Sequence, residues 1–570
     1  FMFPNEARLR NMTYGITIHY DIEVDFIIND TVDGTPMDKS IVIEKVLLGK
    51  FPIMLKSNVC ILSKMDKDVC YQMGECKNDN GGYFIIDGKE KAVVCQEKFA
   101  DNMINIKLHK ADDLYSHSAE IRSVSEDTSK PIRTCGVRII DSHKQIVVSI
   151  PNVKKHIPLL ILMRALGITS DKNIIEICLL DLEKQKHYIE LFRSSVHDAN
   201  IIFNQQNALE YIASFTKRGT LMSVMEILSD FFLPHIGETN FIDKAYFVGH
   251  MVFELLKVYT KEEVPTDRDS FKFKRIELSG VMFYELFREY YLIQKNEIYQ
   301  KISKEYYFHR VQYQKTQQKT LREDDLQEKG ESHTFMSLIE LNYGRYFKDK
   351  TVEKGIRRAF KGNWGAHPHT KKVGAAQELN RLSYNSALSQ LRKLNLPLDS
   401  TAKVVGPRLL NSTQWGFIDP IDTPDGGNIG LHKHLSIGAQ ITCNSSGIKI
   451  ENWIRKKVAM KLVLECTPSY ISKCSKIFVN GKWIGVIEEP LNFVNKMKLY
   501  RRNGIIPIYT SISFDYRRKI VNIYTDSGRL IRPIYYIENN RLSYDRKKII
   551  ERLVDGTAKW ENIVSGFKNK

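Results

Sequence analysis

The apolar positions in the first part of the chain alternate with polar ones, which is typical of strands. Residues 16–28, ITIHYDIEVDFII, follow a period of two. A second β-rich segment, GGYFIIDGKEKAVVC at 81–95, places Asp87-Gly88 between two apolar runs. An Asp-Gly pair suits a type I′ hairpin turn, because both central residues of that turn need positive φ. The N-terminal region is therefore predicted to be mainly β.

Between about residues 155 and 260 the apolar period becomes that of a helix. The run KNIIEICLLDLEKQKHYIELF at 172–192 repeats its apolar residues every three or four positions. Residues 349–365, DKTVEKGIRRAFKGNWG, predict another helix, because Val352, Ile356 and Phe360 share one stripe and Gly362 can end it. The polar run 312–332 offers nothing to bury and is predicted to be an exposed loop.

Residues 374–395, GAAQELNRLSYNSALSQLRKLN, also show a helical period and are predicted to form one helix that ends before Pro397. Amide and arginine side chains lie off its apolar side. They suit hydrogen bonding to a negatively charged ligand, although a solvated surface helix has the same pattern. After about residue 446 the pattern turns β-rich again, with a hairpin predicted on Asn480-Gly481. The chain is therefore predicted to be a multidomain α+β protein.

Length and charge support several domains and a polyanionic partner. The 570 residues exceed the roughly 250–300 that a single core organises. Lys and Arg number 84 against 67 Asp and Glu, a net charge of +17, which favours nucleic acid over an anionic membrane. A lysine-rich solvated surface explains the charge equally well. The longest apolar run, Ile157–Ile168, contains Arg164 and is shorter than the roughly 20 residues that span a bilayer.

The nine cysteines and two neighbouring histidines do not predict a metal or disulfide framework. No cysteine pair has the Cys-x-x-Cys spacing of a zinc or redox motif, so thiols in a reducing compartment are expected. His367 and His369 have no adjacent acidic or cysteine cluster, and a solvated loop is the expected reading.

The segment Pro420–Gly430, PIDTPDGGNIG, is called the acidic loop below. Its two prolines and three glycines exclude regular helix or a central strand. Asp422, Asp425 and Asn428 are three residues apart, whereas an EF-hand needs alternating oxygen ligands and a Glu at position twelve. The loop also lacks the Lys-Ser/Thr pair of a phosphate-binding P-loop. It is predicted to be a rigid, shaped loop.

Four motifs in order within about 75 residues identify a resemblance to the second-largest, β-type subunit of multisubunit DNA-directed RNA polymerases, in its eukaryotic, archaeal or giant-viral form. They are GNWG (362–365), LNRLSYNSALSQLRKLNLP (379–397), GPRLLNSTQWGF (406–417) and DTPDGGNIGL (422–431). The last is similar to the family's E-T-P-E-G-x-x-x-G-L, with Asp422 and Asp425 in place of Glu. Further segments such as PNEARLRNMTY (4–14) and TDSGRLIRP (525–533) keep the family order.

The resemblance implies a domain layout. A mixed β protrusion is expected at 1–120 and 306–362, interrupted by a mainly helical lobe at 121–305. A helix-loop fork is expected at 363–445, and a β-rich, incomplete external region at 446–570.

The resemblance also implies which residues face nucleic acid and substrate. It places Asp422 and Asp425 near the incoming nucleotide, where they are expected to orient neighbouring groups. It also implies that no residue of this chain is catalytic. The residues that the resemblance places against nucleic acid are Gln377, Asn380, Arg381, Gln390, Arg392, Lys393, Lys403 and Arg408. For any single one of them, hydrogen bonding inside the fork is an equal alternative to contact with nucleic acid.

The implied function is to shape the active-centre cleft and to guide template DNA and the RNA–DNA hybrid during transcription. The expected partners are the largest and other polymerase subunits, template DNA, the hybrid and nucleoside triphosphates, without a membrane. The Mg²⁺ of the assembled nucleotidyltransferase is held mainly by the largest subunit, so the isolated chain is expected to be inactive and to bind no metal alone.

Two other classes of function stay open. A free-standing single-stranded nucleic-acid-binding protein needs a basic groove with stacking aromatics. A metal-dependent hydrolase using Asp422 and Asp425 needs a third ligand. The chain starts with Phe1 and is expected to be a piece of a longer protein, located in the nucleus, or in the cytoplasm or virion if a large DNA virus encodes it.

Overall fold

A computed structural model of the chain describes residues 2–558 apart from 29–36, 111, 320–338, 340–341, 348–349, 459, 535–536, 539 and 543–545. The chain forms two compact units. Unit 1 contains residues 1–97, 277–408 and 421–435, and unit 2 contains 98–276, 409–420 and 436–570. Within the described residues, no helix is both long enough and apolar enough to cross a membrane.

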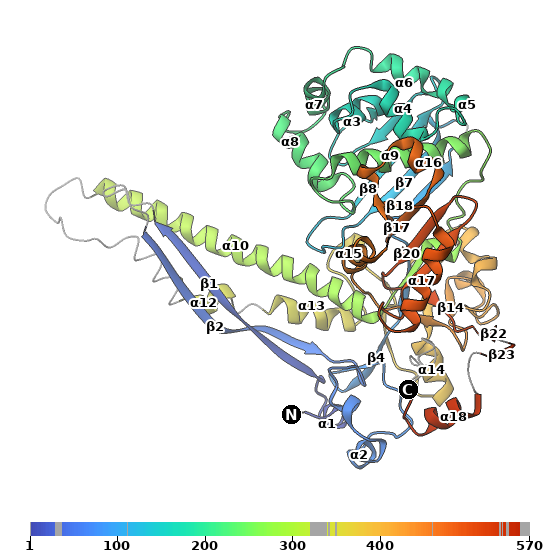
Figure 1. The fold of residues 1–570 in the computed structure, drawn as a ribbon. Coiled ribbons are helices and arrows are strands. Elements are labelled where there is room, and N and C mark those ends of the chain that lie inside the picture. Colours follow the sequence, from blue (N-terminus) through green and yellow to red (C-terminus); the bar gives the residue numbers. More distant parts are fainter. Residues whose placement is uncertain are drawn as a thin grey trace. The chain divides into compact units, whose positions relative to one another are not determined.

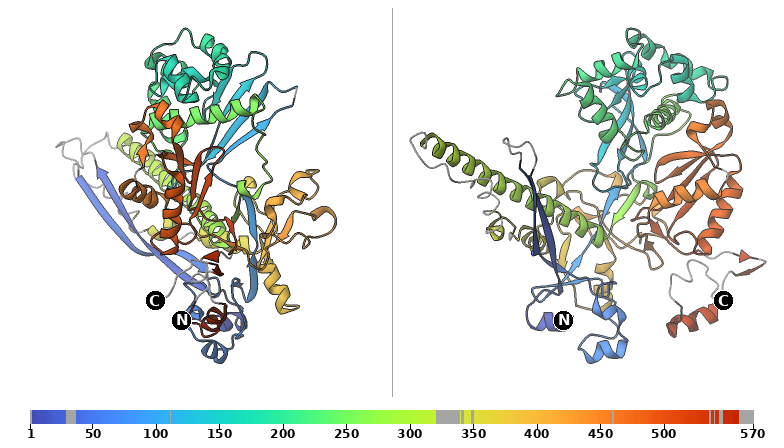
Figure 2. Two further views of the ribbon diagram at one scale, coloured as in Figure 1. Left: turned by 45° about the vertical axis from the view of Figure 1, so that its right-hand side comes forward. Right: turned by 60° about the vertical axis from the view of Figure 1, so that its left-hand side comes forward.

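Unit 1 is built on a long two-stranded ribbon and a long helix. Strands β1 (Gly15–Ile28) and β2 (Met37–Pro52) pair antiparallel and run side by side in all views (Figures 1 and 2). Helix α10 (Ser279–Lys319) packs with α13 (Thr351–Phe360) and β2 around one core. Val352, Ile356 and Phe360 are buried in that core, which confirms the predicted stripe. Residues 312–319 were predicted to be exposed loop but belong to α10, so that part of the prediction is wrong. The rest of the predicted loop, residues 320–332, lies outside the described residues.

The short strands of unit 1 carry the acidic loop. Strands β3 (Phe84–Ile86) and β4 (Lys89–Val93) form the predicted hairpin, with φ of 49° at Asp87 and 78° at Gly88. Strand β12 (Ala376–Glu378) pairs with β4. Strand β13 (Lys393–Asn395) lies between β5 (Cys95–Phe99), to which it is parallel, and β14 (His432–His434), to which it is antiparallel. The acidic loop leads directly into β14.

The single helix predicted for 374–395 is wrong. The segment forms β12, a turn, α14 (Tyr384–Leu391) and β13. The helix starts only after Ser383, whose side chain accepts a hydrogen bond from the Ser386 N–H and caps it. On each side of α14 the backbone pairs with a neighbouring strand. Tertiary pairing therefore overrides the helical period at both ends of the segment.

In unit 2, a five-stranded antiparallel sheet is covered by helices. The sheet has the order β10-β9-β8-β7-β6. Its strands are β6 (Ile104–Leu108), β7 (Tyr115–Ser123), β8 (Arg133–Ile140), β9 (Ile146–Ser149) and β10 (Ile157–Pro158). The helices are α3 (Leu159–Ala165), α4 (Asp171–Leu179), α5 (Lys186–Ile189), α6 (Arg193–Asp198), α7 (Gln205–Ala213), α8 (Leu221–Glu226) and α9 (Phe241–Tyr259). The predicted change from β to helical period near residue 155 is confirmed, and the apolar run at 157–168 is a core element.

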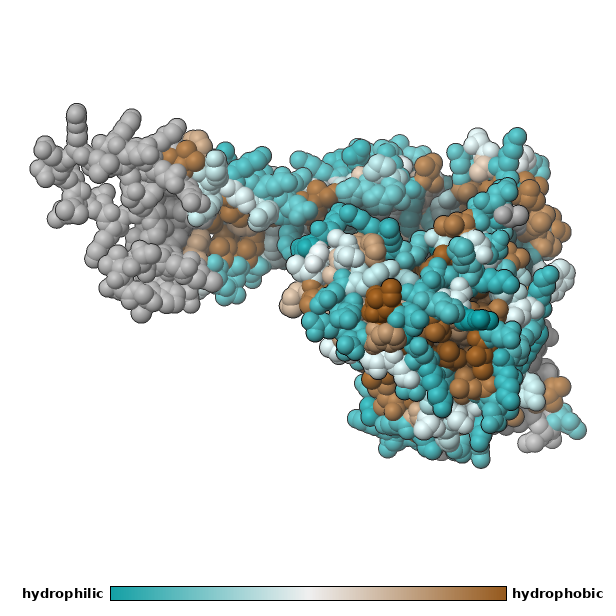
Figure 3. Space-filling view, turned by 90° about the horizontal axis from the view of Figure 1, so that it is seen from above, coloured by the Kyte–Doolittle hydropathy of each residue, from teal (hydrophilic) through white to brown (hydrophobic). Residues whose placement is uncertain are grey.

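The C-terminal part of unit 2 is a second five-stranded sheet with the order β16-β18-β17-β20-β19. Strands β17 (Ser475–Val479) and β18 (Lys482–Ile487) form the predicted hairpin on Asn480-Gly481. The other strands are β16 (Lys461–Leu462), β19 (Ser511–Asp515) and β20 (Ile520–Tyr524), with helices α15 (Gly447–Lys457), α16 (Pro468–Lys473) and α17 (Pro490–Arg502). Figure 3 shows, from above, a mostly hydrophilic surface interrupted by separate apolar patches.

Several shorter elements are also present. They are α1 (Pro4–Leu9), α2 (Lys67–Gln72), α12 (Tyr343–Phe347), β15 (Gln440–Ile441) paired with β21 (Leu530–Ile531), β22 (Ile537–Glu538) paired with β23 (Arg541–Leu542), and α18 (Arg546–Val554). The mixture of helices and sheets agrees with the predicted α+β class.

Two of the predicted domain boundaries fall inside observed elements. Residue 120 lies inside β7 and residue 305 inside α10, whereas the compact units divide at 97/98 and 276/277. The assignment of the four named domains stays a prediction.

Candidate nucleic-acid interface

Arg381 lies in the turn between β12 and α14 and is held by acids of its own unit. Its Nε donates to Glu90 Oε2 at 2.8 Å and its Nη2 to Glu90 Oε1 at 3.0 Å. The guanidinium also covers the Tyr83 ring, with Cζ 5.0 Å from the ring centroid. Burial opposes the charged form of Glu90, but the hydrogen bonds and charges of Arg381 and Arg8 outweigh it and lower the pKa of Glu90. Arg381 therefore forms part of an internal ion-pair network.

The three amide residues of the predicted set bond to one another. Gln390 Oε1 accepts from the Asn380 N–H at 2.7 Å. Its Nε2 donates to the Glu378 carbonyl at 2.9 Å and to Gln377 Oε1 at 3.3 Å. Gln377 in turn donates to the Gly374 carbonyl at 3.0 Å. These bonds fix the turn between β12 and α14 to the helix that follows it.

Arg408 joins two loops through four backbone carbonyls. Its Nη1 donates to Gly427 O at 2.6 Å and Ile429 O at 3.1 Å, both in the acidic loop. Its Nη2 donates to Ser400 O at 2.9 Å and Ala402 O at 3.3 Å, in the loop after β13. The fork geometry of a guanidinium can serve two loops at once, which a lysine cannot. Arg408 therefore positions the acidic loop.

Thr423 and Gly430 close the acidic loop on itself. Thr423 Oγ1 donates to the His432 carbonyl at 2.9 Å and accepts from the Gly430 N–H at 2.9 Å. Gly430 has φ of +71°, and a Cβ at that position would overlap the Arg408 backbone. Gly426 also has positive φ, at +73°, but faces open space, and Gly427 does not adopt the left-handed region. Sequence reasoning used the prolines and glycines of the loop, Gly430 among them, but missed the part of Thr423.

The two acids of the loop have different surroundings. Asp422 Oδ2 lies 3.1 Å from His434 Nδ1, and the Asp422 carbonyl lies at the same distance from that nitrogen. Asp425 precedes a short turn at 426–428 without capping it, and its side chain is exposed. The acidic loop thus ties one carboxylate to β14 and presents the other to solvent.

The remaining basic residues of the predicted set surround these two loops. Lys403 is exposed in the loop that Arg408 holds. Arg392 is the C-terminal cap of α14 and Lys393 begins β13, and both are half-buried. The structure does not test whether any of these three side chains contacts nucleic acid.

Strands β5, β13 and β14 contain a buried polar cluster that sequence reasoning did not predict. Lys433 Nζ on β14 lies 2.9 Å from Glu97 Oε1, with 6% and 1% of the two side chains exposed. Next to them, Asn395 on β13 donates to Gln96 Oε1 at 3.0 Å. A buried charge is tolerated only when it is paired. In the sequence, the only sign of this buried pair is Lys433 itself, which stands between two histidines shortly after the glycines of the acidic loop.

The acids of the loop do not make a metal site by themselves. In the part of the chain that the structure describes, no three His, Cys, Asp or Glu side chains form a group that could hold a metal ion. Asp422 points to His434 instead of toward Asp425 as a shared ligand pair. The rings of His367 and His369 stack with centroids 5.6 Å apart, and His367 lies in the short turn that Glu289 helps to hold. Among the described residues, the acidic loop and the two histidines therefore do not fit a resident metal.

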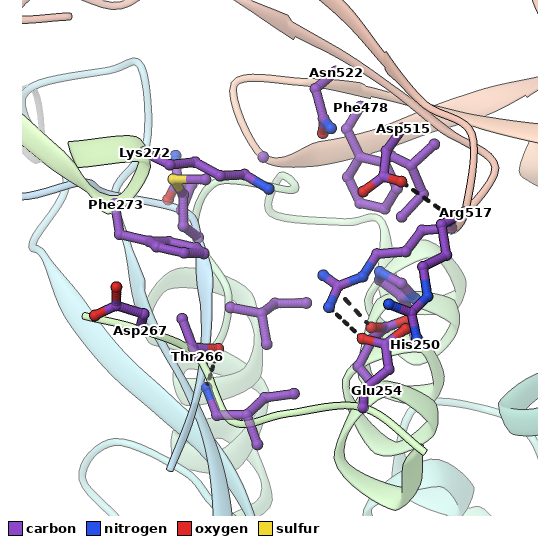
Figure 4. Close-up of a pocket in the computed structure, with 18 of the residues that line it drawn as sticks. His250, Glu254, Thr266, Asp267, Lys272, Phe273, Phe478, Asp515, Arg517 and Asn522 are labelled. Carbon is purple, nitrogen blue, oxygen red and sulfur yellow. Dashed lines mark hydrogen bonds and ion pairs between the residues drawn. The ribbon is translucent and has the colours of Figure 1, made fainter. Parts of the chain in front are cut away.

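Unit 2 contains a separate pocket of about 400 Å³, between α9 and the β19–β20 turn (Figure 4). Arg518 from that turn forms ion pairs with Glu254 of α9 and with Glu263, and its N–H donates to Asp515 Oδ1 at 3.2 Å. Burial disfavours the Arg518 charge, but these carboxylates outweigh the effect and raise the pKa of Arg518. Lys272 extends toward the cavity beside Phe273 (Figure 4). The Arg518 ion pairs therefore tie the β19–β20 turn to α9 and to Glu263 at the edge of the pocket.

Comparison with known proteins places this arrangement in a family. A family model described as RNA polymerase beta subunit matches residues 1–343. Models described as RNA polymerase Rpb2, domain 3, and RNA polymerase Rpb2, domain 4, match residues 377–441 and 477–538. The three matches follow one another along the chain and define an RNA polymerase subunit. The chain belongs to the RNA polymerase beta subunit family.

Individual relatives agree with this family. The chain is 34% identical to DNA-directed RNA polymerase II subunit RPB2 of Encephalitozoon cuniculi, over 99% of this chain and 47% of that protein. It is 32% identical to DNA-directed RNA polymerase II subunit 2 of Arabidopsis thaliana over the same shares. It is 29% identical to DNA-directed RNA polymerase subunit Rpo2 of Saccharolobus solfataricus, over 98% of this chain and 47% of that protein. The chain spans about half the length of the curated relatives it matches.

Proposed function

We propose that the chain works as the N-terminal part of the second-largest subunit of a DNA-directed RNA polymerase, where it shapes the active-centre cleft. The observation that carries the proposal is the acidic loop. The residues that build it lie inside the domain 3 match, and Arg408, Thr423 and Gly430 fix its shape from within the same unit. A loop held this rigidly can keep one exposed carboxylate, Asp425, at a defined place.

The predicted nucleic-acid set divides into two roles. Arg381, Gln377, Asn380, Gln390 and Arg408 support the fork, because the Asn380 N–H and the side chains of the other four bond to other groups of unit 1. Lys403 and Lys393 are the proposed contacts to template DNA or the RNA–DNA hybrid, and Arg392, which also interacts within the chain, is proposed for either role. Contacts of this kind go mainly to phosphates and position the nucleic acid without reading its sequence.

The chemistry of nucleotide addition is shared with other subunits. In the assembled nucleotidyltransferase, Mg²⁺ supplies charge neutralisation at the reacting phosphates and is held mainly by the largest subunit. Asp425 and Asp422 orient groups around the nucleoside triphosphate. The isolated chain is proposed to be inactive, because the acids in the parts of the chain that the structure describes form no metal-binding group.

The proposed location is the nucleus, since the eukaryotic relatives described above are RNA polymerase II subunits. The comparisons give no support to a virion location. A free-standing single-strand-binding protein is not favoured, because the matched domains follow one another along nearly the whole chain.

Reconstitution tests the proposed function. The chain is co-expressed with the largest subunit, the remaining half of the second-largest subunit and the smaller subunits, and RNA primer extension is measured on a template scaffold. We expect the chain to co-purify with the largest subunit and extension to require it. A chain that binds oligonucleotides tightly but never assembles would instead establish the single-strand-binding alternative.

A further inference from the structure

The pocket between α9 and the β19–β20 turn, called the unit 2 pocket below, has the face of a sheet as one wall. Successive side chains of a strand point to opposite faces, so Ile520, Asn522 and Tyr524 share one face of β20. Phe478 of the neighbouring strand β17 is paired with Asn522 in the parallel register. All four residues line the pocket, whereas the alternate residues of β20 are buried in the core on the other face.

Helix α9 forms the opposite wall, and His250 on it has only one ring nitrogen engaged. Phe247, His250 and Glu254 line the pocket at the spacing of three and four residues that puts side chains on one side of a helix. His250 is 5% exposed, and its Nδ1 lies 3.3 Å from Lys476 Nζ. An ammonium group can only donate, so Nδ1 accepts this hydrogen bond. Burial and the charge of Lys476 lower the pKa of His250 well below 6.5, so the ring is neutral and carries its proton on Nε2.

Three polar groups on these two walls are open to a ligand. The His250 Nε2–H, the Asn522 side-chain amide and the Tyr524 hydroxyl form no hydrogen bond with any residue that the structure describes. Polar groups that are buried or half-buried are nearly always hydrogen-bonded, to protein or to a bound molecule. All three can donate a hydrogen bond, and they come from residues that line one cavity.

The acids of the unit 2 pocket are already paired. Glu254 and Glu263 form ion pairs with Arg518. Asp515 accepts a hydrogen bond from the Arg518 N–H at 3.2 Å, and Asp267 accepts one from an asparagine amide at 2.9 Å. The negative charge of the lining is therefore engaged inside the protein.

Two cations of the lining are not paired in this way. Lys272 and Arg517 form no ion pair with an acid in the described part of the chain. Figure 4 shows Lys272 and Phe273 on one side of the cavity and Phe478 and Arg517 on the other. Exposed cations alone are typical of a solvated surface, but these border a cavity whose walls supply aromatic rings and hydrogen-bond donors. Donors and cations bind negative charge, and aromatic rings pack against a flat apolar group.

We propose that the unit 2 pocket binds a small organic anion, in which a phosphate or carboxylate group is attached to a flat ring. The His250 Nε2–H, the Asn522 amide and Lys272 bind the charged group, and Phe478 packs against the ring. The cavity volume of about 400 Å³ lies within the range of roughly 300–1,000 Å³ that small-molecule sites occupy. A cationic ligand fits less well, because the acids of the lining are engaged. This site goes beyond the proposed function and does not depend on it.

Isothermal titration calorimetry on the full chain tests the proposal. The probes are adenosine 5′-monophosphate and 2-naphthoate, each at millimolar concentration, with adenosine and 2-naphthamide as their neutral analogues. We expect at least one anion to bind, and its neutral analogue to bind at least about tenfold more weakly, because hydrogen bonds to a charged group are lost. Binding of the first anion alone identifies a phosphate ligand, and binding of the second alone identifies a carboxylate ligand.

Substitutions assign the binding to this pocket. Lys272→Met, Asn522→Ala and His250→Phe are each expected to weaken binding of the anion about tenfold. Lys496→Met and Asn495→Ala are the matched controls, because both residues are exposed on α17 and neither lines the pocket. We expect the two controls to bind as the wild type does. Circular dichroism checks the fold of each variant, and if His250→Phe does not fold, the other two pocket variants decide.

Several results would overturn the proposal. They are no binding of either anion, binding of the neutral analogues as tight as that of the anions, and equal affinities in the pocket variants and the controls. The measurement needs no other polymerase subunit. Failure of this site therefore leaves the proposed function standing, and failure of reconstitution leaves this site standing.

Discussion

Asp422 and Asp425 are three residues apart in one loop, yet only one of them is tied to the fold. The Asp422 carboxylate lies beside His434 Nδ1, whereas the Asp425 side chain is exposed. Identical residue types in one motif therefore have separable roles, and each role can be measured.

We expect Asp425→Ala to slow nucleotide addition or to change nucleotide selection in the assembled enzyme without reducing the stability of the chain. The acid supplies local charge, and the loop keeps its shape through Arg408, Thr423 and Gly430. By analogy with residues that orient metal ligands, the loss in rate is about 10- to 100-fold. Single-turnover nucleotide addition at equal assembly is the measurement. Asp422→Ala is the comparison, and it should also lower the stability of the chain because it removes the contact with His434. Identical rates of nucleotide addition for wild type and Asp425→Ala would show that Asp425 has no role in that step.

Lys476 on β17 predicts a pH dependence of stability. Burial, opposed by Glu254 and reinforced by Lys257, lowers the pKa of Lys476 from 10.5 to about 8. His250 lies next to it, with Nδ1 3.3 Å from Lys476 Nζ. Because the unfolded chain holds the proton up to higher pH, stability rises as pH increases from about 8 to 10.5.

The difference between wild type and Lys476→Met isolates this effect from other titrations. We expect the free energy of unfolding of the wild type to gain about 2 kcal/mol on the variant across this pH range. Denaturant unfolding followed by tryptophan fluorescence is suitable, since the Lys476 ammonium lies 4.8 Å from the centroid of the Trp483 ring. A constant difference between the two proteins at pH 8 and 10.5 would refute the assignment.

At the scale of elements, the shape of the acidic loop depends on its contacts with the loop after β13 and with strand β14. Arg408 links the loop after β13 to the acidic loop, Thr423 links the acidic loop to β14, and Lys433 on β14 pairs with Glu97 of β5. The Lys433–Glu97 pair joins segments that are far apart in sequence, whereas the Arg408 and Thr423 bonds join neighbouring loops. The shape of the loop is therefore a property of the assembled unit and not of its Pro and Gly content alone.

Gly430→Ala is expected to destabilise unit 1 by about 2–3 kcal/mol, because the added methyl group would overlap the Arg408 backbone and φ is positive. Gly426→Ala is the matched control. Its φ is nearly the same, but nothing lies within 4 Å of the added group, so only the backbone strain applies, about 1 kcal/mol. Urea unfolding of the two variants gives the comparison. Equal losses would mean that the close approach to Arg408 has no energetic weight.

At the scale of the whole molecule, the role of the chain in nucleic-acid binding depends on which basic side chains remain available. The formal charge of +17 does not reveal that Arg381 and Arg408 are used within unit 1. The exposed Lys403 is a better candidate for neutralising a phosphate.

In the assembled enzyme, Lys403→Ala is expected to weaken binding to a template scaffold and to reduce the slope of log affinity against log salt by about one. Arg381→Ala is expected to leave that slope unchanged and to lower thermal stability, because it leaves Glu90 with less compensation of its charge. Fluorescence anisotropy with a labelled scaffold at several salt concentrations measures both variants. The opposite pattern, with Arg381→Ala changing the slope, would return Arg381 to the nucleic-acid contacts.

The sequence by itself determined the elements that rest on local rules. The hairpins at Asp87-Gly88 and Asn480-Gly481, the helical region after residue 155 and the buried stripe of α13 follow from turn chemistry and periodicity. Ordered motifs also determined the family, because four matches in sequence are specific even when each alone is weak.

Only the tertiary structure decided the form of residues 374–395 and the partners of their side chains. The apolar period of that segment is equally compatible with a helix, and pairing with β4 and β5 turned its two ends into strands. In the same way, Arg381, Gln390 and Arg408 have side chains that suit phosphate or carboxylate equally. Their partners come from Glu90, Glu378 and the carbonyls of two loops, which the sequence separates by up to 291 residues and which only folding brings within hydrogen-bonding distance.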